Sequence, residues 1–382
     1  MRRILIRRLL PFVFLCVVLT VTIQADDVTD EITSSIDSEL SMFIESLPDY
    51  VKDFFPKESL NGDPSYILNG KINEKSFLDA IISYLFFGID KALSSFGSIL
   101  ALLIISSILN TAVSSFSSTN VTGVFSICST LCVSLTVFKL CSDLAALVTS
   151  YMKILCDVMN TFTPVMTAMY IMSGNITSAT VSATSMVLFI SLIDVLLVSS
   201  IIPLVKFSLA LTCVKASGTG CDFSGITKTL KTTYTSVTVF IMSIFMFVLS
   251  FKNILSQSAD SLSMKTAKFA ISSFVPIVGS SINEALRTVT SSLSLIKNSC
   301  GVIAIISIAI LMLPIIINLF LNKLSFNLLA SLAKLIGCNN ESGVLDEADS
   351  ICGFLLALVC CGCVLFIFAI TIFIKTGVYV GA

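Results

Sequence analysis

Residues 258–301, SADSLSMKTAKFAISSFVPIVGSSINEALRTVTSSLSLIKNSCG, are the stretch on which the interpretation of the chain depends. The stretch places charged side chains inside an otherwise apolar sequence, among them Lys265, Lys268, Glu284, Arg287 and Lys297. Its longest uncharged run, 269–283, is shorter than the roughly 20 residues that a full membrane crossing needs. Because Pro276 removes a backbone donor and Gly279 loosens the chain, a helix should bend or break here. We therefore expect an interfacial or re-entrant element in this stretch.

The composition of the whole chain indicates an integral membrane protein. Of 382 residues, 55% are hydrophobic and only 12% are charged, which is far more apolar than a soluble domain requires. The predicted fold class is all-α: a polytopic α-helical integral membrane protein with an N-terminal signal sequence and a broken or re-entrant central element. The net charge of −1 gives no sign of nucleic-acid binding.

Catalytic and metal sites are not expected. The chain contains no histidine, which is the commonest general base and metal ligand. Most of the 13 cysteines lie in apolar runs, where a free thiol packs as a small hydrophobe, and the cluster Cys360, Cys361 and Cys363 lacks the paired spacing of a zinc site. Without a phosphate-binding loop, any ATP-driven step would come from another chain. We expect no enzyme activity and no cofactor.

The beginning of the chain has the pattern of an exported protein. Four arginines within the first eight residues precede an apolar run and Ala25, so residues 1–25 are predicted to be a signal peptide, with an uncleaved membrane anchor as the alternative. Residues 26–76 form an exported acidic region in which Leu40, Phe43, Ile44 and Leu47 recur at helical spacing. This amphipathic face packs either on the protein's own helices or on a partner. Residues 77–382 form the multi-spanning membrane domain.

Six apolar runs are candidate membrane spans: 93–113, 124–140, 180–214, 235–251, 302–321 and 351–374. The run 180–214 is too long for a simple crossing, so it is either two segments hinged near Pro203 or one protruding helix. Between 142 and 174 lies a more polar helical piece.

Charge bias orients the spans only in part. The loop 215–233 carries three lysines against Asp222, which favours the cytoplasmic side. Counting spans from an exported N-terminal region agrees with this position, but leaves the lysine-bearing stretch 258–301 on the exported side. Re-entry of that stretch, or one additional span, would remove the conflict.

Asp194 is the charge that stands deepest in an apolar run. An ionisable group in a span costs about 2.5–3.5 kcal/mol and usually faces a bundle interior or water. Its functional interpretation is a polar pathway or proton site. Its structural interpretation is an ion pair with Lys206 or Lys139, or a position near the headgroups.

Two other charged groups have less specific interpretations. Lys265 and Lys268 lie one helical turn apart and either reach the headgroups, line an aqueous path or contact another subunit. Asp346, Glu347 and Asp349 precede the last apolar run, where we expect a solvated helix N-terminus.

The central stretch also resembles a known family. The order K-T-A-K-F (265–269), F-V-P-I-V-G (274–279) and L-I-K-N-S-C-G-V (295–302) is similar to the signature of the stage III sporulation protein AE family of endospore-forming bacteria. The resemblance makes Pro276, Gly279 and Gly301 motif residues. It extends from Leu47 to the last apolar segment, although only this motif is specific.

What the resemblance implies is a membrane component of the channel-like assembly that joins mother cell and forespore. Its partners would be the other stage III sporulation A-operon proteins and, directly or indirectly, stage II sporulation protein Q. The implied location is the mother-cell-derived membrane around the forespore, with membrane lipid as surroundings. A homo-oligomer is a further possibility.

Three functions follow from these observations. The first is a permease-like core in which 258–301 lines or gates the path, together with Asp194 as a polar pathway group. The second is an independent secondary transporter driven by protons or sodium, with Asp194 as the coupling site. The third is a non-conducting scaffold that recruits soluble partners.

Overall fold

The computed structural model describes residues 43–45, 47–52, 74–116, 119–216, 224–274 and 279–375, and they contain helices and no strand. The helices are α3 (Asp49–Lys52), α6 (Glu74–Phe116), α7 (Thr119–Met172), α8 (Ile176–Ile193), the π-helix η1 (Asp194–Ser199), α9 (Ile201–Ala216), α10 (Ser224–Phe274), α11 (Gly279–Leu335) and α12 (Asn339–Lys375). The predicted signal peptide lies outside the described residues.

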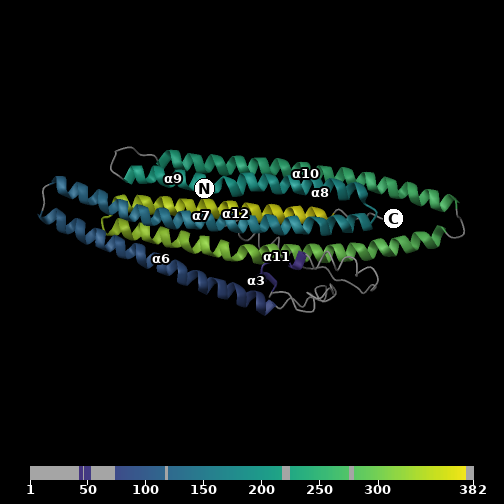
Figure 1. Ribbon diagram of the computed structural model, residues 1–382, viewed down its shortest axis with the longest axis horizontal. Coiled ribbons are helices and arrows are strands. Elements are labelled where there is room, and N and C mark those ends of the chain that lie inside the picture. Colours follow the sequence, from purple (N-terminus) through teal and green to yellow (C-terminus); the bar gives the residue numbers. More distant parts are fainter. Residues whose placement is uncertain are drawn as a thin grey trace.

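The long helices run side by side along one axis (Figure 1). Helices α7 and α12 occupy the middle, with α6 and α11 on one side and α8, α9 and α10 on the other. Within the described ranges, six helical segments are long and apolar enough to cross a membrane, and each predicted span falls inside one of them. The prediction of a polytopic α-helical membrane protein is therefore confirmed.

The long apolar run 180–214 forms one rod with an irregular turn in it. Helices α8 and α9 follow the same line in Figure 1, joined by η1. Pro203 provides the physical reason, because its ring cannot donate a hydrogen bond and disturbs the preceding turn. Two side chains satisfy carbonyls in this turn: Ser200 Oγ donates to Val195 O at 2.9 Å, and the Tyr234 hydroxyl of α10 donates to Leu196 O.

The polar piece 142–174 is not a separate element. Residues 142–172 belong to α7, which continues without interruption through 54 residues, or about 80 Å of helix, and residues 173–174 form the turn that follows it. This length exceeds the roughly 30 Å of bilayer hydrocarbon by a wide margin. The bundle is thus longer than the membrane is thick, and α7 carries polar residues through its middle.

Helices α10 and α11 extend beyond the other described helices at one end of the bundle. Asp260 of α10 accepts hydrogen bonds from Thr177 N and Ser178 N, which places the start of α8 level with Asp260. Residues 261–274 then add about 20 Å of helix past that level. Figure 1 shows the ends of α10 and α11 reaching farther than the end of α12. The chain between them, 275–278 with Pro276, lies outside the described residues, and re-entry stays a prediction.

The described part of the N-terminal acidic region packs on the protein's own bundle. Phe43, Leu47 and Val51 are buried, and the Phe43 ring lies 5.1 Å from the Phe162 ring of α7. The short helix α3 contacts α11. Of the two alternatives for the amphipathic face, residues 43–45 and 47–52 therefore adopt packing within the chain.

Candidate functional site: charged side chains in the bundle

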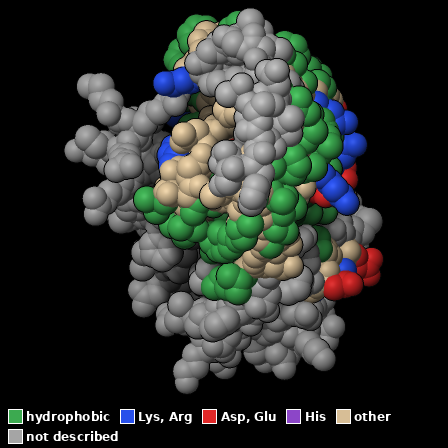
Figure 2. Space-filling view, turned by 90° about the vertical axis from the view of Figure 1, so that its left-hand side faces the viewer, with side chains coloured by type: hydrophobic (Ala, Val, Ile, Leu, Met, Phe, Trp, Pro, Cys, Tyr) green, Lys and Arg blue, Asp and Glu red, His purple; other side chains and the backbone are tan. Residues whose placement is uncertain are grey.

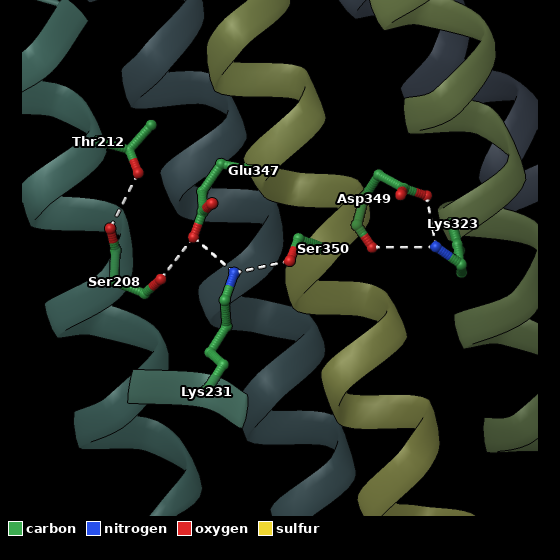
Figure 3. Close-up of polar contacts among 7 residues, drawn as sticks. All are labelled: Ser208, Thr212, Lys231, Lys323, Glu347, Asp349 and Ser350. Atoms are coloured by element: carbon green, nitrogen blue, oxygen red, sulfur yellow. Dashed lines mark hydrogen bonds and ion pairs between the residues drawn. The ribbon is translucent and has the colours of Figure 1, made fainter. Parts of the chain in front are cut away.

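A buried ion pair joins α10 to α12 near one end of the bundle (Figure 3). Lys231 Nζ lies 2.6 Å from Glu347 Oε1 and also donates to Ser350 Oγ at 2.8 Å. Ser208 of α9 donates to the same Glu347 oxygen at 2.6 Å. The two charged side chains are only 6% and 12% exposed. Because each charge has a partner and further hydrogen bonds, this group is a structural connection between three helices.

Two neighbouring carboxylates of α12 also have lysine partners. Asp349 lies 2.7 Å from Lys323 Nζ, and Asp346 lies 2.8 Å from Lys334 Nζ, both on α11. The prediction that Asp346, Glu347 and Asp349 form a solvated helix N-terminus is wrong. Helix α12 begins at Asn339, so these residues lie in its second and third turns and face the neighbouring helices.

Glu341 is a further buried carboxylate, which the sequence did not single out. Its side chain is 4% exposed and accepts hydrogen bonds from Ser106 Oγ and Ser129 Oγ, each at 3.0 Å. The two serines come from α6 and α7. Glu341 thus joins the first turn of α12 to two other helices.

A polar seam connects α8 and α10 at the opposite end. Besides the bonds from Asp260 to the start of α8, Ser178 Oγ donates to Ser256 Oγ at 3.3 Å and Ser182 Oγ donates to Asn253 Oδ1 at 3.1 Å. Nearby, Lys297 of α11 lies over the Tyr170 ring at 5.2 Å from its centroid. These contacts are again internal to the bundle.

Asp194 differs from the buried groups among these, because it lies on the outside. It begins η1, its side chain is exposed, and it makes no ion pair with any residue the structure describes. The predicted pairs with Lys206 and Lys139 are therefore not formed. Both lysines are exposed as well. The structural interpretation of Asp194 as a buried ion pair is wrong.

Asp194 lies halfway along the most clearly membrane-like part of the bundle. The run 351–374 of α12 has no charged residue and is about 36 Å long, with Gly362 at its middle. A Cβ at Gly362 would lie 2.6 Å from Met152 Cε and 3.3 Å from Leu197 Cδ1. Met152 and Leu197 are therefore at the depth of Gly362, and Asp194 is less than one turn from Leu197.

Two charges of α7 lie at the same depth. Lys153 follows Met152 directly, and Asp157 is one turn farther on. Both side chains are exposed, and neither makes an ion pair with a described residue. Met152 and Leu197 both lie at Gly362 and α7 contacts η1, so Asp157 and Asp194 lie in the same region.

The charges of α7 belong to a continuous exposed face. Residues of this face recur three or four positions apart: Lys139, Asp143, Ala146, Ser150, Lys153, Asp157 and Asn160. In the end-on view of Figure 2, basic and acidic side chains gather next to each other mainly along one side of the molecule. The helical spacing of these residues in the sequence indicates such a face. The expectation of a more polar helical piece at 142–174 did not identify the face.

Of the remaining predicted site residues, those that the structure places, Lys265, Gly279 and Gly301, lie away from Asp194. Lys265 is exposed on the part of α10 beyond Asp260, and Gly279 is the first residue of α11. Lys268 lies on α10, but its side chain is outside the described part, as is Pro276. Gly301 has a packing role, because a Cβ there would lie 2.2 Å from Ile374 Cγ1.

Metal-binding geometry is absent from the described ranges. No three His, Cys, Asp or Glu side chains in them are grouped to hold a metal ion. The cysteines described there are free thiols.

The fold and the charges together define the class: a multi-pass helical membrane protein with internal ion pairs and a charged outer face at membrane depth. The model of the family "Stage III sporulation protein AE" matches residues 65–377. The chain belongs to this family. A curated relative of the same name from Bacillus subtilis (strain 168) is 23% identical over 324 residues, covering 84% of this chain and 79% of the relative. No solved structure matches.

Proposed function

We propose that the protein is a permease-like membrane component of the channel complex between mother cell and forespore, needed for forespore development. Family membership makes the chain a multi-pass sporulation membrane protein and implies involvement in the stage III sporulation A system. The observation that carries the further step is the position of Lys153, Asp157 and Asp194 on the outside of the bundle, halfway along the uncharged run of α12.

Direct contact with lipid tails would be costly for these three charges. An ionisable side chain at the centre of a span costs about 2.5–3.5 kcal/mol on insertion scales, and such side chains face protein or water. A free-standing bundle would expose all three to lipid. The charged face therefore supports a protein that works inside an assembly, in preference to an independent transporter.

Asp194 is the best candidate for a group that contacts the transported species. Its carboxylate is exposed at mid-depth, and the π-helical turn that carries it is a common feature of functional sites in helices. The proposal places the polar path at η1, beside α7. This differs from the sequence-based expectation that 258–301 lines the path, because Lys265 lies past the level at which α8 begins.

The proposed partners are other stage III sporulation A-operon proteins and, directly or indirectly, stage II sporulation protein Q. The proposed location is the mother-cell-derived membrane around the forespore. Co-purification from sporulating cells distinguishes a component of this complex from an independent transporter. We expect stage III partners to accompany the protein out of the membrane, whereas recovery of the protein without them would contradict the proposal.

The substitution Asp194→Asn tests whether the Asp194 carboxylate acts in the proposed polar path. We expect forespore gene expression to fall while the amount of the protein in the membrane stays unchanged, because Asp194 has no described ion-pair partner that would be left alone. Asp346→Asn is the matched control, since that carboxylate is 52% exposed and lies outside the uncharged run. Loss of the protein itself in Asp194→Asn would show a structural role and contradict the proposal.

A further inference from the structure

The exposed face of α7 carries a repeated charge pattern. At each of two depths it presents a lysine and an aspartate four residues apart: Lys139 with Asp143, and Lys153 with Asp157. All four side chains are exposed, and none forms an ion pair with a described residue. The face between the two charge pairs consists of the small residues Ala146 and Ser150.

The two charge pairs lie at defined depths in the bundle. Lys153 and Asp157 are near Gly362, as described above. Lys139 and Asp143 lie 14 residues earlier than Lys153 and Asp157 on the same continuous helix. The two charge pairs are therefore about 20 Å apart along α7.

We propose that this face of α7 binds the same face of a second copy of the chain, with Lys153 of each copy paired with Asp157 of the other and Lys139 paired with Asp143 in the same way. The inference rests on the proposed function, in which the protein works inside an assembly. It adds the identity of the partner that covers the charged face.

The charge pattern matches a second copy for a geometric reason. Copies of one membrane protein insert in the same orientation, so the same residue lies at the same depth in each. A twofold axis along the membrane normal then brings residue i against residue j and residue j against residue i. A lysine and an aspartate four residues apart differ by about 6 Å in height, which the lysine side chain spans. Two reciprocal ion pairs form at each depth.

Two further features of the face fit this arrangement. With two lysines and two aspartates, its formal charge is zero, so two identical faces do not repel each other. Ala146 and Ser150 permit two α7 helices to approach closely, as small residues do at helix contacts in membranes. Asp194, on the neighbouring η1, takes no part in these pairs and stays available to the polar path.

Charge variants on two differently tagged copies test the proposal. When both copies carry Lys153→Asp, four carboxylates face each other, and when both carry Asp157→Lys, four lysines do. We expect capture of the second tagged copy to fall at least about tenfold in each case, because facing like charges cost several kcal/mol. When one copy carries Lys153→Asp and the other carries Asp157→Lys, every facing pair is complementary again, and capture should recover.

The mixed pair distinguishes a second copy from any other partner. A different protein, or another segment of the same chain, would lose contact with both variants, and mixing them would restore nothing. Failure of the mixed pair to recover, with both variants present in the membrane at normal levels, would overturn the inference while leaving the assembly itself in place. Lys265→Asp, at an exposed lysine outside this face, is the control and should leave capture unchanged.

Discussion

Lys231 and Glu347 are the residues whose contacts make the sharpest prediction of stability. Replacing Lys231 with methionine leaves the Glu347 carboxylate buried with Ser208 as its remaining described side-chain partner. Removing one member of a buried ion pair typically costs about 3–5 kcal/mol. We expect thermal unfolding in detergent to show a loss of this size. Lys334→Met, at a pair that is about half exposed, should cost no more than about 1 kcal/mol. Equal effects of the two substitutions would contradict the network in Figure 3.

Gly301 has a packing role that a single methyl group can test. A Cβ at this position would lie 2.2 Å from Ile374 Cγ1, so Gly301→Ala should separate α11 from the end of α12 at a cost of about 1–3 kcal/mol. The loss of stability should appear even though alanine is more favourable than glycine in a helix by about 1 kcal/mol.

The measurement is the melting temperature of the purified protein. Adding Ile374→Ala should recover part of the loss, and Gly97→Ala, with nothing within 4 Å of its Cβ, should not destabilise. A melting temperature unchanged by Gly301→Ala would show that this contact is not tight.

Individual site residues differed in how far the sequence could predict them. Asp194 was identified, because a lone carboxylate in an apolar run is conspicuous without any structure. The partner of Glu347 could not be identified, since Lys231 is 116 positions away and nothing in the sequence connects them. The face of α7 lay between these cases: its spacing was visible, but its exposure depends on which neighbours cover α7.

At the scale of elements, the start of α8 depends on a residue from another helix. Asn175 precedes α8 without a side-chain hydrogen bond, and Asp260 of α10 accepts from Thr177 N and Ser178 N instead. A carboxylate in this position also interacts favourably with the positive end of the helix dipole.

Asp260→Ala should therefore loosen the first turn of α8 and cost about 1–2 kcal/mol, as loss of an N-terminal cap does. Hydrogen exchange should become faster at the Thr177 and Ser178 amides while the middle of α8 stays protected. Asp260→Asn keeps a side-chain oxygen acceptor and should have a smaller effect. Exchange rates that Asp260→Ala leaves unchanged would mean that another group caps this helix.

The sequence predicted which elements exist better than where they end. Every predicted apolar run lies in a helix, because membrane spans need long apolar stretches. Pro203 correctly marked an irregular region, but the irregular turn lies at Asp194–Ser199, where Ser200 and Tyr234 satisfy carbonyls. The continuity of α7 was missed, because the sequence contains polar residues where the structure keeps one helix.

At the scale of the whole molecule, the length of the helices and the charged face lead to the same conclusion. The bundle is longer than the bilayer is thick, and its ends are held together by ion pairs and polar seams. Between those ends, Lys153, Asp157 and Asp194 are exposed on the outside of the bundle, level with the uncharged run of α12. A bundle of this kind is stable in a membrane when protein or water covers that face.

The most direct measurement of this claim uses the absence of tryptophan from the sequence. A single tryptophan introduced by Ser199→Trp reports on the charged face at η1, because Ser199 is exposed and lies about one π-helical turn after Asp194. One introduced by Phe247→Trp reports on α10, where Phe247 is 71% exposed. Both proteins are placed in vesicles whose lipid tails carry bromine near mid-depth, after capture of a tagged second copy has verified assembly. We predict strong quenching of the tryptophan at 247 and weak quenching of the tryptophan at 199. Equal quenching at the two positions would show that lipid contacts the charged face and would contradict the account.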